Sequence, residues 1–102
     1  MSLNPPKGMK DFTPELEILR KKIISIIEEI FQKYGFDPIS TPTVEYWDTL
    51  KGKYGEEAEK KLIWRFKLPF SNKKYALKYD NTVPLARYYA KYRPPLPFKR
   101  YV

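Results

Sequence analysis

Apolar residues recur at every third or fourth position between residues 14 and 34, which is the spacing of one face of an α-helix. Thr13 fits the N-cap of this helix, Pro14 fits its first position, and Gly35 fits its end. We therefore predict a helix over 14–34 that buries one face. The residues of this apolar stripe are Leu16, Leu19, Ile23, Ile26, Ile27, Ile30, Phe31 and Tyr34.

The segment after this helix favours extended backbone. Pro38 and Pro42 exclude a helix interior, and a proline has no N–H to donate to a neighbouring strand. We predict an edge strand, or a strand at an interface, over residues 36–46, and then one helical turn over 47–51. Residues 56–61 are polar and fit either a short helix or a mobile segment.

Two runs rich in apolar and aromatic residues, 62–66 and 75–79, have the composition of strands. The short link between them predicts an antiparallel hairpin. Asn81 and Thr82 can cap a second helix, which we predict over 82–92. These elements together indicate the α+β class, with one long N-terminal helix, a short antiparallel sheet and a second helix.

The chain has 102 residues and ends inside a last predicted strand, 96–102. A strand with no return leaves a row of unpaired backbone groups. We therefore expect the chain to be the first part of a larger domain and to dimerise or associate further through its open apolar edges. The alternative is a complete small α+β domain whose last strand lies at a sheet edge.

The positive charge of the chain is concentrated in its last third. Residues 1–65 contain 11 basic and 11 acidic residues, whereas residues 66–102 contain nine basic residues and one acid, Asp80. The whole net charge of +8 therefore comes from residues 66–102, which also hold nine of the 17 aromatic residues. Such a surface attracts anions such as a nucleotide or a nucleic acid, but it is equally explained as an edge that faces acidic neighbours.

The composition excludes several kinds of site. The chain has no cysteine and no histidine, so we exclude a disulfide framework, a thiol nucleophile, a zinc site and a histidine-based triad. It has no run of eighteen apolar residues and no apolar signal segment at its start, so we expect no membrane span and a cytoplasmic location.

Several short segments, in order along the chain, form a more specific pattern than any one of them alone. They are PKGMKDF at 6–12, YGFDPISTP at 34–42, GKYGEEA at 52–58, WRF at 64–66 and LKYDNTVPLARY at 77–88. This set resembles the catalytic domain of the class II aminoacyl-tRNA synthetases, specifically the histidyl-tRNA synthetase family. The second segment looks like motif 1, with Pro42 at its characteristic proline, and the last looks like the loop that binds the amino-acid substrate.

The resemblance implies roles for three residues. Asp80 and Thr82 would bind the substrate histidine, the carboxylate through its ammonium group and the hydroxyl through one further contact. From the residues alone, pairing of Asp80 with Lys78, Arg87 or a nearby lysine, and capping by Thr82, remain open. Pro42 would lie at the homodimer interface. The resemblance implies no catalytic residue and no metal ligand in this chain.

The resemblance also implies a reaction for the parent enzyme, the ATP-dependent joining of histidine to its tRNA with Mg²⁺. Residues 1–102 would cover motif 1 to the start of motif 2, without the anticodon-binding domain. Because the arginines that hold ATP would lie in motifs 2 and 3, we expect the chain alone to be inactive and to bind neither ATP nor Mg²⁺. Two alternatives are a non-catalytic paralogue, such as the regulatory subunit of ATP phosphoribosyltransferase, and a small basic module that binds RNA through 66–102. The loop version at 79–82 favours the synthetase over the paralogue.

Overall fold

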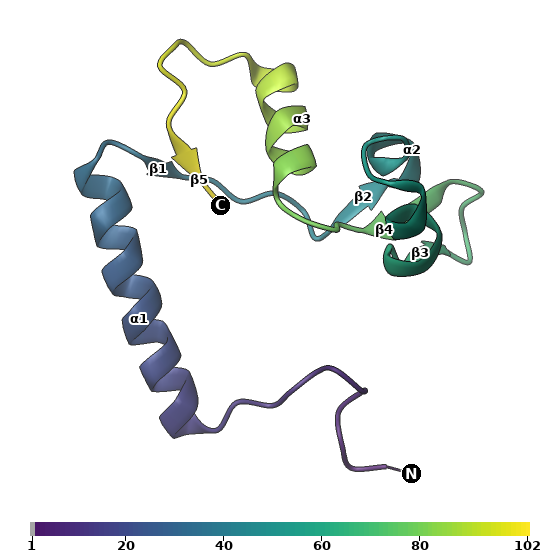
Figure 1. The fold of residues 1–102 in the computed structure, drawn as a ribbon, viewed down its shortest axis with the longest axis horizontal. Coiled ribbons are helices and arrows are strands. Elements are labelled where there is room, and N and C mark those ends of the chain that lie inside the picture. The colour runs from purple at the N-terminus through teal and green to yellow at the C-terminus, as the bar shows by residue number, and fades with distance from the viewer. Residues whose placement is uncertain (1) are drawn as a thin grey trace. The chain divides into compact units, whose positions relative to one another are not determined.

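The computed structural model describes residues 2–102, which divide into two compact units. The first unit ends at Asp37, and the second is Pro38–Val102. Figure 1 shows the helices and strands of both units, and each unit is described by itself below.

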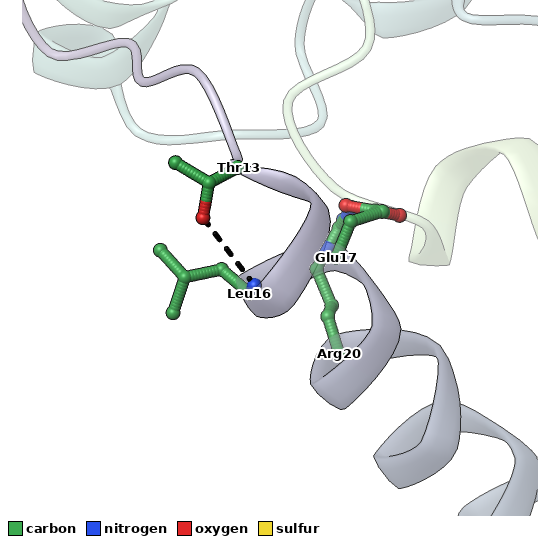
Figure 2. A network of polar contacts seen from close by, with 4 residues as sticks. All are labelled: Thr13, Leu16, Glu17 and Arg20. Atoms are coloured by element: carbon green, nitrogen blue, oxygen red, sulfur yellow. Dashed lines mark hydrogen bonds and ion pairs between the residues drawn. The ribbon is translucent and has the colours of Figure 1, made fainter.

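The first unit contains α1, Pro14–Lys33, which confirms the predicted helix. The Thr13 hydroxyl oxygen accepts a hydrogen bond from the Leu16 amide at 3.4 Å, as Figure 2 shows, so the predicted N-cap is confirmed. After the helix, Gly35 has a φ of +83°, the left-handed conformation that glycine adopts readily at the end of a helix.

The apolar stripe of α1 is exposed, so the prediction that this helix buries one face is wrong for the described residues. None of the residues of α1 is buried, and those of the stripe are between 39% and 71% exposed. A helix buries an apolar face only by packing it against another element. Residues 2–13 of this unit form no helix or strand that could cover it.

The second unit is built around a three-stranded antiparallel sheet. Its strands are β2 (Val44–Tyr46), β3 (Arg65–Lys67) and β4 (Lys74–Leu77), in the order β2-β4-β3. The β3–β4 pair confirms the predicted hairpin, and the predicted extended segment 36–46 supplies β2. Ala76 of β4 lies opposite Glu45 of β2 on one side and Arg65 of β3 on the other, so β4 is the middle strand and pairs with both edge strands.

Two short helices pack beside this sheet. The predicted turn at 47–51 is α2, Trp47–Leu50. The π-helix η1, Ala58–Leu62, covers most of the polar segment 56–61 and also Leu62, which was predicted to begin a strand. The small core consists of Leu50, Ile63 and Ala76, which are at most 6% exposed. Figure 1 shows α2 beside the sheet, where it contacts β2 and β4, and Leu50 of α2 belongs to the same apolar cluster as Ala76 of β4.

The predicted second helix is confirmed as α3, Thr82–Tyr92. The predicted last strand is only β5, Arg100–Tyr101, which pairs with β1, Asp37–Pro38, in a two-stranded sheet. The Ile39 amide continues this pairing by donating to the Tyr101 carbonyl at 2.8 Å. The strand is shorter than expected, and Pro97 inside the predicted range has no N–H to donate to a ladder. Within residues 2–102, no helix is both long enough and apolar enough to cross a membrane.

Candidate substrate-binding site

Asp80 lies in the link between β4 and α3, directly before the first turn of the helix. Its Oδ1 atom accepts two hydrogen bonds, one from the Tyr54 hydroxyl at 2.8 Å and one from the Thr82 amide at 3.2 Å. Among residues 2–102, no partner binds the second carboxylate oxygen, Oδ2, and no ion pair includes Asp80. The exposed carboxylate therefore keeps one oxygen for a ligand.

Thr82 is the first residue of α3 and lies beside Asp80. The N-cap residue is Asn81, as predicted, but its side chain makes no capping hydrogen bond. Asp80 supplies the acceptor instead, because its carboxylate reaches the amide two residues on. The Thr82 hydroxyl makes no hydrogen bond to any other described residue and lies on the exposed surface.

Tyr54 is a part of this site that the sequence analysis missed. Its ring packs on the core of Leu50, Ile63 and Ala76, and it meets the ring of Tyr79 edge to face at a centroid distance of 4.9 Å. Burial, and then the hydrogen bond to Asp80, raises the pKa of Tyr54 to about 12, so its phenol is a donor at neutral pH. Because 26 residues separate Tyr54 from Asp80, no local sequence pattern indicates this contact.

Arg87 pairs with Glu45, so the alternative that Arg87 binds Asp80 is wrong. Its Nε atom lies 2.5 Å from Oε1 and 3.1 Å from Oε2 of Glu45. The glutamate side chain is 5% exposed and that of the arginine is 33% exposed, so the carboxylate is buried and the guanidinium only partly. This pair joins β2 to α3. Lys78, the other suggested partner of Asp80, forms no ion pair within residues 2–102.

Pro42, the residue predicted for the dimer interface, lies two residues before β2. It lines a cavity of about 480 Å³ together with the ion pair of Glu45 and Arg87 and with Thr41. The buried hydroxyl of Thr41 has no hydrogen-bond partner within the described residues. Asp80 does not line this cavity.

The described residues contain no cluster of metal-ligating side chains. Among residues 2–102, no group of three or more acidic, histidine or cysteine side chains lies close enough together to hold a metal ion. Proteins usually bind Mg²⁺ through one or two carboxylates together with the phosphates of a nucleotide.

Solved structures of known proteins share this fold. Histidyl-tRNA synthetase from Nostoc sp. PCC 7120 matches with a TM-score of 0.84 at 33% sequence identity, covering 98% of this chain and 23% of that one. A Bacillus halodurans protein described as an ATP phosphoribosyltransferase regulatory subunit/histidyl-tRNA synthetase matches with a TM-score of 0.80 at 25% identity, over 98% of this chain and 26% of that one. The fold is that of a class II aminoacyl-tRNA synthetase.

Sequence comparison gives the family. The family model described as Histidyl-tRNA synthetase matches residues 8–97. The histidine–tRNA ligase of Nanoarchaeum equitans is 76% identical over 97 residues, which are 95% of this chain and 24% of that protein. The ligase of Aeropyrum pernix is 62% identical over 99 residues, which are 95% of this chain and 22% of that protein. The chain belongs to the histidyl-tRNA synthetase family.

The match covers the N-terminal part of these relatives. The chain spans about a quarter of the length of the curated relatives that it matches. Since these relatives are histidine–tRNA ligases, neither a regulatory paralogue nor a separate RNA-binding module is favoured.

Proposed function

We propose that this chain belongs to an enzyme that joins histidine to its tRNA with ATP and Mg²⁺, and that Asp80 and Thr82 bind the ammonium end of histidine. One observation carries the second part of this proposal. The carboxylate of Asp80 is fixed through Oδ1, while Oδ2 and the neighbouring Thr82 hydroxyl have no partner among residues 2–102. A fixed carboxylate oxygen is a strong acceptor for an ammonium group.

The charge of residues 66–102 supports the rest of this proposal. ATP and tRNA are both polyanions, and a surface with an excess of lysine and arginine attracts them. We propose that the complete enzyme holds Mg²⁺ through residues other than those described. The cytoplasmic location remains a prediction from the sequence.

We expect the Asp80→Asn variant to bind histidine at least about 10-fold more weakly, because a neutral amide replaces a charge-assisted hydrogen bond. NMR titration of the chain with histidine, and with imidazolepropionate, which lacks the ammonium group, measures this effect. Only the histidine affinity should fall. The matched control is Asp48→Asn, which neutralises an exposed carboxylate in the same unit.

Two results would contradict the proposed site. In one, histidine shifts resonances elsewhere and leaves those of residues 79–83 unchanged, or shifts none at all. In the other, Asp80→Asn and Asp48→Asn bind histidine equally well.

We propose that a second copy of the chain covers the apolar stripe of α1, and that Pro42 lies at a homodimer interface. The stripe exposes isoleucines along most of the helix, and water-exposed apolar patches of this kind favour association. Analytical ultracentrifugation should find a dimer for the unmodified chain. The double variant Ile23→Lys with Ile27→Lys should be a monomer, whereas Glu28→Lys, which adds the same side chain outside the stripe, should stay dimeric. A monomeric unmodified chain at high concentration would refute this proposal.

A further inference from the structure

We propose that Tyr54 is a positioning residue for Asp80, which fixes Oδ1 of the carboxylate and so assigns Oδ2 to the ammonium group of the substrate. This inference rests on the proposed function, in which Asp80 binds histidine. Tyr54 would touch Asp80 and act on the ligand through it.

The ring of Tyr54 is held in place by the core of the second unit. It packs against Leu50, Ile63 and Ala76, and the edge-to-face contact with Tyr79 fixes its orientation further. Its hydroxyl therefore reaches Oδ1 of Asp80 from a rigid support, at 2.8 Å. A donor that is placed before the ligand arrives costs little ordering entropy on binding.

The loop that carries Tyr54 is also tied at its base. Gly52 has a φ of +77°, which a residue with a side chain rarely adopts, and its amide donates a hydrogen bond to the carboxylate of Glu59 in η1. The Lys53 amide donates to the Leu50 carbonyl at 3.3 Å. These contacts connect the loop to the elements on both sides of it, so the position of the phenol does not depend on Asp80 alone.

The hydrogen bonds divide the two oxygens of Asp80 between protein and ligand. An oxygen of a carboxylate offers about two lone pairs. The Tyr54 hydroxyl and the Thr82 amide donate to the two lone pairs of Oδ1, so protein groups occupy this oxygen fully. Only Oδ2 retains its full capacity to accept, and the side chain cannot rotate without breaking both bonds. The geometry thus fixes the direction from which an ammonium group can approach.

The Tyr54→Phe variant tests this role, because it removes the hydroxyl and keeps the ring on the core. We expect its histidine affinity to fall about 3- to 10-fold, the effect of one hydrogen bond. The affinity for imidazolepropionate should not change. The matched control is Tyr46→Phe, which removes a hydroxyl that makes no hydrogen bond within residues 2–102. The coupling between the Hα and Hβ protons of Asp80 should show several rotamers in Tyr54→Phe and one rotamer in the unmodified chain.

A double-mutant cycle separates positioning from a general structural effect. If Tyr54 acts through the carboxylate, Tyr54→Phe has no further effect on histidine affinity once Asp80→Asn is present. An equal loss in both backgrounds would overturn the inference, and so would a single Asp80 rotamer in Tyr54→Phe. If Asp80→Asn weakens histidine binding and Tyr54→Phe does not, the proposed function stands and the positioning role fails. If histidine does not bind at all, the proposed function fails, and the rotamer measurement still decides whether Tyr54 orients Asp80.

The same hydrogen bond predicts a pH dependence that supports the test. The pKa of Tyr54 is raised to about 12 from the ordinary 10.0, first by burial and then by Asp80. This pKa lies above that of tyrosine in the unfolded chain. The protonated Tyr54 hydroxyl therefore stabilises the folded second unit fully below pH 10.0, and this contribution is lost as the pH rises through about 12. NMR of the tyrosine ring carbons should show this pKa falling only in part in Asp80→Asn, because burial is the larger cause.

Discussion

The Arg87→Met variant is expected to lose about 2–3 kcal/mol of the free energy of unfolding of the second unit. Removing the guanidinium leaves the carboxylate of Glu45, which is 5% exposed, without its partner. A lost partner in a fully buried pair costs about 3–5 kcal/mol, and the partial exposure of Arg87 lowers this figure. Urea unfolding followed by tryptophan fluorescence measures the loss, because both tryptophans of the chain, Trp47 and Trp64, lie in this unit.

The control for this prediction is Lys51→Met, which breaks the exposed ion pair with Asp48 in the same unit. Exposed pairs contribute about 0–1 kcal/mol, so this variant should unfold at nearly the same urea concentration as the unmodified chain. Replacing Glu45 by leucine together with Arg87→Met should recover much of the loss, because no buried charge then remains unpaired. Equal losses for Arg87→Met and Lys51→Met would contradict the prediction.

The Leu50→Ala variant is expected to destabilise the second unit by about 3 kcal/mol. Leu50 is fully buried and contributes one of only three side chains to the apolar core. Truncation removes its transfer free energy and leaves a cavity that so small a core cannot close without moving β4 or η1. The same urea measurement applies, and the midpoint should fall well below that of the unmodified chain.

Two further variants are the controls for the predicted loss of stability in Leu50→Ala. Leu62→Ala makes the same chemical change at a side chain that is 54% exposed, and it should cost no more than about 0.5 kcal/mol. Leu50→Met keeps nearly the same volume and should cost less than about 1.5 kcal/mol. If Leu50→Ala is no worse than Leu62→Ala, the described core does not stabilise this unit.

Local patterns were sufficient for most of the secondary structure. The cap at Thr13, the spacing of three and four and the glycine after the helix predicted α1 to within one residue. The second helix and the hairpin followed from the same kind of signal. The shortened β5 departs from its prediction, and Pro97 within the predicted strand has no N–H to donate to a ladder.

The sequence predicted only part of the candidate site. Asp80 and Thr82 came from a motif within one loop, and the structure places them side by side at the start of α3. Sequence reasoning left three partners open for the carboxylate and did not include Tyr54 among them. It left Arg87 open as one of these partners, whereas the structure pairs Arg87 with Glu45.

Helix caps, residue periodicity and short motifs act over a few neighbouring positions, so they were sufficient to predict the family and most of the helices and strands. The contact of Tyr54 with Asp80, 26 positions along the chain, and that of Arg87 with Glu45, 42 positions apart, arise from the tertiary fold. The exposure of the apolar stripe of α1 is likewise a property of the fold. These outcomes depend on which surfaces the strand pairing and helix packing bring together, and no short-range pattern specifies them.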